Sequence, residues 1–306
     1  MAPRGAAMRY RFATADVFTD RRFGGNPLAV LLDARGLSDE QMMVVTREFN
    51  LSETVFVLPP EDPRHTRKLR IFTPGRELPF AGHPTVGTAY LLAALGEIPL
   101  AGEETAITFE EGVGPVAVRL RAPGGVPVFA ELTAVRPPEL SPAPADRAAL
   151  AQALSLAPGD LGDWAEPEIV SCGTPFLYVP LRDRAALARA RVRIDRWEAV
   201  ASAVSEIYLV TRDPELPGSH LRARMFVPGM GIAEDPATGA AVTALGGYLG
   251  VREHADGTFR WVVEQGFEMG RPSLLHLTVE RRDGEVAEIR VGGAAVAVAE
   301  GTIEVP

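Results

Sequence analysis

Short apolar runs, separated by glycine, proline and charged residues, alternate along the chain with a few longer stretches of helical character. Runs such as residues 54–58 are β-branched and apolar, which is typical of buried strands. The segments with strand character are 9–17, 28–32, 54–58, 68–73, 105–109, 116–120, 128–133, 168–170, 177–181, 207–211, 221–227, 261–264, 274–281, 285–291 and 294–300. This alternation predicts an α+β protein.

Four helical stretches are expected among these strands. Ser38 is followed three residues later by Gln41, a capping-box pair that predicts a helix to about Phe49. Residues 85–95 and 237–249 are apolar around their whole circumference, so we expect a mixed sheet to enclose each of these two helices. The basic stretch 184–196 predicts a solvated helix face followed by a strand.

Four short passages occur twice in the same order, with an offset of about 150 residues. The first member of each pair begins at Gly25, Arg70, His83 or Glu110, and the second at Gly173, Arg224, Asp235 or Glu264. The repeat predicts two pseudo-symmetric lobes. The first would span residues 9–133, with the C-terminal strand 294–304 as a candidate addition, and the second 134–293. The Pro-rich stretch 134–150 would join them.

Composition narrows the function classes. The formal net charge of −9 should repel nucleic acid and anionic membranes, but it does not exclude a small anionic substrate. No apolar run reaches the roughly 20 residues of a membrane span, and no signal-peptide core is present. One cysteine excludes an internal disulfide framework and fits a cytoplasmic location. Metal-ligand spacings and the common cofactor motifs are absent.

The repeated turn x-Pro-x-x-Gly-x-Ala carries the candidate chemistry. Proline fits the first helical position, which would put His83 and Asp235 at the two N-caps. Helix N-termini attract anions, and small residues let backbone N–H groups approach a ligand. We therefore expect both ends to meet at one cleft that binds a carboxylate or an enolate. The residues expected to contact the substrate there are Gly82, Gly87, Thr88, Thr238, Gly239 and Ala240.

A structural interpretation of these residues stays open. Asp235 could be a simple helix cap, and His83 a cap or a surface residue. Glu53 lies between a helix and an apolar strand, where it could be an outward turn residue or a buried proton carrier. Asn26, next to a proline, is interpreted as a turn former. Gln265 could reach the cleft or lie in a solvated loop.

The passages FGGNPLAV, FNLSETVFV, IFTPGRELPFAGHPTVGTA, GVGPV, RMFVPGMGIAEDPATGAA and EQGFEMGRPS resemble the PhzF-like family of phenazine-biosynthesis isomerases, within the diaminopimelate-epimerase fold. The resemblance spans nearly the whole chain. It implies two lobes, each a mixed sheet or barrel around a central helix, and a homodimer. It also implies an enzyme without metal or cofactor.

The resemblance implies roles for three residues. In related epimerases, cysteines at both helix starts act as acid and base, whereas this chain has His83 and Asp235 there, and Cys172 at neither. In the phenazine isomerase, the carboxylate of the matching Asn-x-x-Glu motif moves a proton between ring carbons, and here that residue is Glu53. His83 and Asp235 would hold polar groups of the substrate. Ala240 stands where those isomerases tend to carry serine.

The resulting hypothesis is a cofactor-independent isomerase that moves a proton between carbons of a small carboxylated substrate. Two alternatives remain open. One is an amino-acid-type epimerase or racemase without catalytic cysteines, with Glu53 opposed to Asp235 or His83. The other is a non-catalytic ligand-binding member of the fold; the presence of all three candidate residues argues against it.

Overall fold

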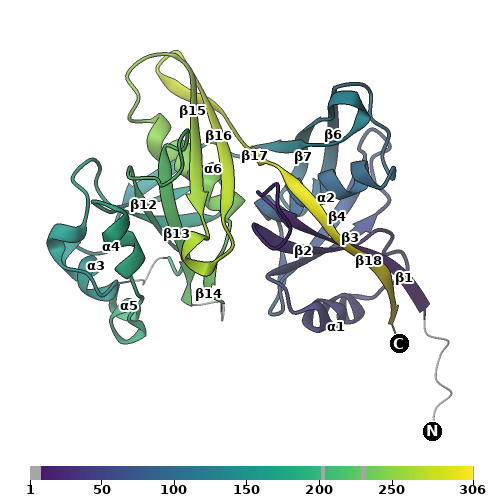
Figure 1. Cartoon of the computed structure of the whole chain (residues 1–306), viewed down its shortest axis with the longest axis horizontal. Helices are drawn as coiled ribbons and strands as arrows, with labels where there is room; N and C mark the ends of the chain where they lie inside the picture. The colour runs from purple at the N-terminus through teal and green to yellow at the C-terminus, as the bar shows by residue number, and fades with distance from the viewer. Residues whose placement is uncertain (1–7, 201–203, 229–231, 306) are drawn as a thin grey trace, which may run out of the picture. The chain divides into compact units, whose positions relative to one another are not determined.

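The computed structural model describes residues 8–200, 204–228 and 232–305. Gly229, which closes one passage of the predicted repeat, lies outside them. Contacts divide the chain into two compact units (Figure 1). The first comprises Met1–Val135 with Gly292–Pro306, and the second comprises Arg136–Val291.

The first unit is a mixed sheet with two helices. Its strands pair in the order β18-β1-β2-β3-β4-β6-β7-β8, with β2–β3 and β4–β6 parallel and the other pairs antiparallel. The short strand β5 pairs with β4 beside β6. The elements are β1 (Met8–Val17), β2 (Asn26–Leu31), α1 (Asp39–Phe49), β3 (Glu53–Leu58), β4 (Arg67–Phe72), β5 (Glu77–Leu78), α2 (Gly82–Ala94), β6 (Glu104–Glu111), β7 (Gly114–Arg121), η1 (Pro123–Gly125), β8 (Phe129–Thr133) and β18 (Ala295–Val305).

The two helices of this unit differ in their surroundings. Helix α2 is buried along almost its whole length and contacts β1, β2, β3, β7, β8 and β18, so the sheet encloses it. Helix α1 packs one face, through Met42 and Val45, against β3 and β4. The predicted capping box of α1 is confirmed, because Ser38 accepts from the Gln41 N–H and the Gln41 side chain accepts from the Ser38 N–H.

The second unit repeats this plan. Its strands pair in the order β9-β10-β11-β12-β13-β15-β16, with β11–β12 and β13–β15 parallel, and β14 pairs with β13. Helix α6 is buried and contacts β9, β10, β11 and β16. The elements are β9 (Glu139–Pro142), α3 (Arg147–Ala153), η2 (Pro158–Asp160), β10 (Glu168–Ser171), β11 (Pro175–Pro180), α4 (Arg184–Arg189), α5 (Ile194–Val200), β12 (Ile207–Thr211), β13 (Leu221–Val227), β14 (Ile232–Asp235), α6 (Gly239–Gly250), β15 (Gly257–Gln265), η4 (Phe267–Met269), β16 (Ser273–Arg282) and β17 (Glu285–Gly293).

The sequence repeat is visible in the strand register. Lys68 lies opposite Glu110 in the parallel β4–β6 pair, and Arg222 lies opposite Glu264 in the parallel β13–β15 pair. The carboxylate of Glu110 accepts the backbone N–H groups of residues 61 and 62, and that of Glu264 accepts those of residues 215 and 216. The predicted α+β fold, with two like units each built around a central helix, is confirmed.

The division between the units, after Val135, falls in the Pro-rich stretch 134–150. This stretch also contains strand β9 and the start of α3, because β9 finds a partner in β10. Two local expectations are wrong. The basic stretch 184–196 continues into α5 rather than a strand, since Trp197 is buried in a core cluster. Both central helices also begin at other residues than predicted, α2 at Gly82 and α6 at Gly239.

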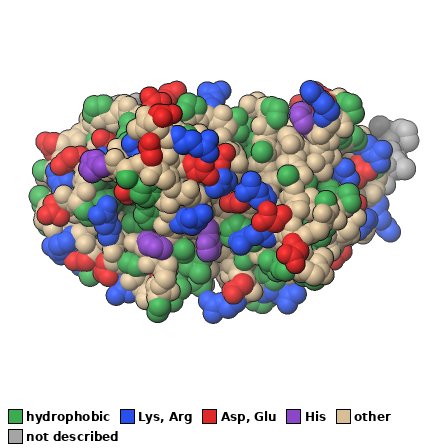
Figure 2. Space-filling view, turned by 90° about the horizontal axis from the view of Figure 1, so that it is seen from above, with side chains coloured by type: hydrophobic (Ala, Val, Ile, Leu, Met, Phe, Trp, Pro, Cys, Tyr) green, Lys and Arg blue, Asp and Glu red, His purple; other side chains and the backbone are tan. Residues whose placement is uncertain are grey.

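The surface facing the viewer in Figure 2 mixes basic and acidic side chains, without a broad area of one sign. Several of the protein's surface charges form pairs, such as Arg9 with Glu304 and Arg35 with Asp33. Among the helices of the described residues, none combines the length and hydrophobicity that a membrane span requires.

The close packing around α6 gives a testable prediction. A Cβ at Gly247 would lie 2.3 Å from Pro138 Cβ. Gly247→Ala should therefore lower the free energy of unfolding by about 1–3 kcal/mol, although helix propensity alone favours alanine. Urea denaturation measures the change. Gly159→Ala is the matched control, because a Cβ there meets open space. Equal stability of both variants would contradict the tight enclosure of α6.

Candidate active site

Three residues of the first unit meet at the start of α2. Glu53 opens β3, and His83 is the second residue of α2. His83 Nε2 lies 3.3 Å from Glu53 Oε2, and His83 Nδ1 lies 3.2 Å from the Asn26 side-chain nitrogen. Asn26 and His83 are buried, and the Glu53 side chain is 14% exposed. The alternative that Glu53 points outward into solvent is therefore wrong, and so is the interpretation of Asn26 as a turn former.

The predicted N-cap position of His83 is also wrong. The N-cap of α2 is Ala81, whose carbonyl accepts both the backbone N–H and the hydroxyl of Thr85. These bonds start the helix ahead of Pro84. His83 consequently projects from the first turn, where its ring can contact Glu53.

The His83 ring is uncharged. Burial lowers the pKa of His83 to about 3, so the neutral imidazole persists at neutral pH. The Asn26 amide nitrogen can only donate, so Nδ1 of the ring is the acceptor. The ring proton then belongs to Nε2, the atom that faces Glu53. The neutral ring therefore faces Glu53 without adding a positive charge.

The remaining predicted residues of α2 are all buried. Gly82 opens the helix, so its N–H belongs to the first turn, whose donors lack helical partners. Gly87 and Thr88 lie further in, where helix geometry commits the backbone N–H groups to intrahelical bonds. A Cβ on Gly87 would lie 2.5 Å from a methyl of Val17 and 2.7 Å from one of Leu28. Close packing against β1 and β2 thus explains this glycine.

Asp235 occupies a different position from His83. It is the last residue of β14, and the N-cap of α6 is Thr238, so the predicted cap role of Asp235 is wrong. The Thr238 hydroxyl donates to Asp235 Oδ2 at 2.5 Å. Gly239 and Ala240 are the first two residues of α6, which places their N–H groups in the first turn.

Gln265, at the end of β15, is a residue whose role the sequence left open. Its amide nitrogen donates to the Asp235 carbonyl and to the Thr238 hydroxyl, both at 2.9 Å. Its carbonyl accepts from the Thr238 N–H and from the Tyr208 hydroxyl. Burial, and then the nearby Asp235, raise the pKa of Tyr208, so this hydroxyl stays a donor. Buried Gln265 fixes the loop between Asp235 and α6.

Metal ligands are not grouped in the part of the chain that the structure describes, where no three His, Cys, Asp or Glu side chains are placed to hold an ion. Cys172 is half-buried, and burial raises the pKa of its thiol to about 12. The thiol therefore stays protonated at neutral pH, which makes it a poor catalytic base.

The sheet-enclosed helices and the acid–imidazole pair define an enzyme of the diaminopimelate-epimerase-like fold. The model of the phenazine biosynthesis-like protein family matches residues 15–301, and the chain belongs to this family.

Named relatives agree with that assignment. An uncharacterised isomerase of Mesorhizobium japonicum is 42% identical over 94% of this chain and 96% of its own length. The trans-2,3-dihydro-3-hydroxyanthranilate isomerase of Pseudomonas aeruginosa is 33% identical over 95% of this chain and 98% of its own. A crystal structure of a PhzF-family protein from Bacillus anthracis has a TM-score of 0.87 at 25% identity, covering 97% of this chain and 99% of that one. The chain is an isomerase of the proton-shuttling type.

The protonation state of His83 can be tested directly. We expect its ring resonances to stay constant between pH 8 and 5, because burial keeps the folded-state pKa near 3. The unfolded chain takes up this proton near pH 6.5, whereas the folded chain takes it up only near pH 3. The free energy of unfolding should therefore decrease as the pH falls from about 6.5 toward 3. An NMR pH titration with ¹⁵N-labelled histidine checks this, with exposed His254 as the internal reference. Uptake of a proton by His83 above pH 5 would contradict it.

The role of Gln265 gives a second prediction. Gln265→Leu leaves the Tyr208 hydroxyl, the Asp235 carbonyl and the Thr238 N–H without their buried partner, at about 1–3 kcal/mol for each such group. We expect a marked loss of unfolding free energy in urea, with Gln265→Glu intermediate because it retains the acceptor. A stability of Gln265→Leu equal to that of the wild type would refute the supporting role.

Proposed function

We propose that Glu53 is the group that takes a proton from one carbon of the substrate and returns it to another. The 3.3 Å contact between Glu53 and neutral His83 carries this proposal. A carboxylate held next to an N–H donor, and largely removed from water, is suited to proton transfer with carbon. His83 takes up no second proton during the proposed reaction, since burial keeps the pKa of its ring near 3.

The proposed reaction needs no redox step. Glu53 removes a proton from carbon, and the electron pair enters the adjacent π system of a carboxylated substrate. The carbon at the other end of that system then takes the proton from the Glu53 carboxyl group, so substrate and product differ only in the position of hydrogen and double bond. A preorganised donor can stabilise the charge that develops in between.

The second unit carries proposed polar contacts of its own. Asp235, oriented by Thr238 and Gln265, is proposed to accept a hydrogen bond from a hydroxyl or amino group of a ligand. The first-turn N–H groups of each central helix are proposed carboxylate donors in their own unit: that of Gly82 in α2, and those of Gly239 and Ala240 in α6. Gly87 and Thr88, in the second turn of α2, are proposed to support its first turn, and Thr238 to shape the turn before α6.

The substrate class follows from the same arguments. A cyclic carboxylate such as trans-2,3-dihydro-3-hydroxyanthranilate, named for the Pseudomonas relative, has the required hydrogen on a carbon next to a π system. Ala240 lacks a hydroxyl, which suits a substrate that needs one hydrogen bond fewer. We further propose a cytoplasmic location, supported by the single cysteine, and a homodimer, which the family resemblance implies.

The Glu53→Gln variant tests the proposal. Glutamine fills the same space but cannot carry the proton, so turnover should fall by about 10²–10⁴-fold. Proton NMR in D₂O with trans-2,3-dihydro-3-hydroxyanthranilate measures turnover and the entry of deuterium at one ring carbon. The control is Glu48→Gln, which changes an exposed carboxylate of α1. Near-normal activity of Glu53→Gln would exclude the mechanism. Deuterium entry at a stereocentre without a double-bond shift would indicate an epimerase instead.

A further inference from the structure

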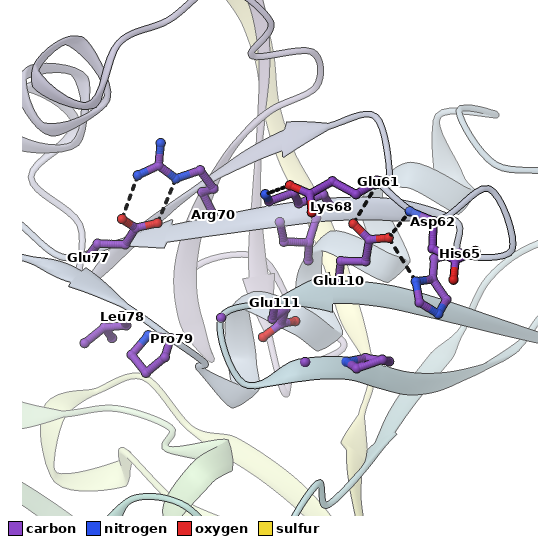
Figure 3. Close-up of a pocket in the computed structure, with 14 residues that line it drawn as sticks. Glu61, Asp62, His65, Lys68, Arg70, Glu77, Leu78, Pro79, Glu110 and Glu111 are labelled. Atoms are coloured by element: carbon purple, nitrogen blue, oxygen red, sulfur yellow. Dashed lines mark hydrogen bonds and ion pairs between the residues drawn. The ribbon is translucent and has the colours of Figure 1, made fainter.

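A buried carboxyl group in the first unit has no role in the proposed reaction. Glu111 ends β6 and lines a cavity of about 720 Å³, shown in Figure 3. The basic side chains at this cavity are paired with other acids: Lys68 with Glu61, Arg70 with Glu77, and His65 with Glu110. Asp62, which also lines it, pairs with Arg64. Within the described residues, the partner of Glu111 is Thr85 of α2.

The positions of the oxygen atoms indicate where a proton must lie. Thr85 Oγ1 is 2.8 Å from the Ala81 carbonyl oxygen and 2.7 Å from Glu111 Oε1. The hydroxyl has one hydrogen, and the carbonyl can only accept. If that hydrogen is donated to Ala81, the contact with Glu111 requires a second one, which only a protonated carboxyl can supply. Glu111 Oε2 is buried with no hydrogen-bond partner among the described residues, as expected for an uncharged group.

The second unit has an uncharged donor at the equivalent position. Glu110 and Glu264 occupy matching register positions, so Glu111 corresponds to Gln265, the next residue in each strand. Gln265 donates an N–H to the loop that precedes α6. Glu111 contacts the first turns of α2 in the same way. Both strands thus end in a buried side chain that supports the start of a central helix.

We propose that Glu111 is an uncharged carboxylic acid in the native protein and that it donates to Thr85. Through this bond it holds the first turns of α2, and with them His83, in place. Glu111 is therefore a positioning residue, and its effect on catalysis rests on the function proposed above for Glu53 and His83.

The electrostatic surroundings agree with this geometry. Burial raises the pKa of Glu111 to about 8. His83, on the helix that Glu111 contacts, is neutral and offers no compensating charge. A raised pKa means that the folded chain keeps a proton that the unfolded chain loses above about pH 4.5. The stabilisation is complete below that pH and is lost as the pH rises through about 8.

Glu111→Gln tests the charge state without any substrate. Glutamine mimics the neutral acid and does not titrate. As the pH rises from 4.5 to 8, the unfolding constant of the wild type should therefore increase relative to that of the variant, by up to about tenfold per pH unit. At pH 7 the wild type should also show an infrared band of a protonated carboxyl that the variant lacks. The proposal would be overturned if the unfolding free energies of wild type and variant changed with pH in parallel and the wild type showed no such band.

Glu110→Gln is the matched control in the same strand. Bonds from the backbone N–H groups of Glu61 and Asp62 lower the pKa of Glu110, which identifies it as an ionised acceptor. This variant should be destabilised, and it should keep the infrared band that we assign to Glu111. If the Glu110→Gln variant lacked the band, the band would belong to Glu110 and not to Glu111. That result would overturn the proposal.

The positioning effect needs a separate readout at His83. In ¹H–¹⁵N spectra, Glu111→Gln should keep the His83 ring resonances. Thr85→Val, which keeps the volume but removes the hydroxyl and its contacts with Glu111 and Ala81, should shift them. Unchanged resonances in folded Thr85→Val would refute the positioning role. These measurements do not depend on turnover. If the Glu53→Gln variant proved active, the proposed function would be wrong, but the test of Glu111 would still be valid.

Discussion

The structure depends on the burial of two helices that have no polar face. Helices α2 and α6 are apolar around their whole circumference, so packing on one side would leave most of each in water. The strands surround each helix, so that their side chains pack against it on several sides. Polar chemistry is then restricted to the helix ends. The contact between Glu53 and His83 lies at such an end, where the first turn also provides N–H donors without helical partners.

Enclosure has a second consequence, because the loop before each buried helix needs partners for its own polar groups. The strand ends at Glu110–Glu111 and at Glu264–Gln265 supply them. In each pair, the first residue binds backbone N–H groups of a neighbouring loop and the second supports the helix start. The repeat therefore preserves a supporting framework. The chemistry at the helix starts has diverged, with an imidazole in the first unit and a carboxylate in the second.

Much of the fold is readable from local pattern. The capping residues of α1 and the strands with β-branched runs depend on neighbours in sequence, and both are confirmed. The repeat is recognised by comparing two distant parts of the chain, and the matching strand register confirms it. The errors occur where tertiary contacts decide. Proline should open a helix, yet Ala81 captures two bonds from Thr85 and starts α2 earlier. Strand β9 forms within a Pro-rich stretch because β10 offers it an edge. Asn26 was assigned to a turn because its partner, His83, is 57 residues away in sequence.

The absence of charge on His83, at the start of α2, bears on both the Glu53 contact and the proposed state of Glu111. A protonated imidazole would pair strongly with Glu53 and make that carboxylate a weaker base. Burial prevents this by keeping His83 uncharged, so the ring lies 3.3 Å from Glu53 Oε2 without adding a charge. An ionised acid buried against the same helix would favour protonation of His83, because a nearby negative charge stabilises imidazolium. An uncharged group at position 111 removes that influence. The low-polarity environment that makes Glu111 retain its proton is the same one that keeps His83 neutral.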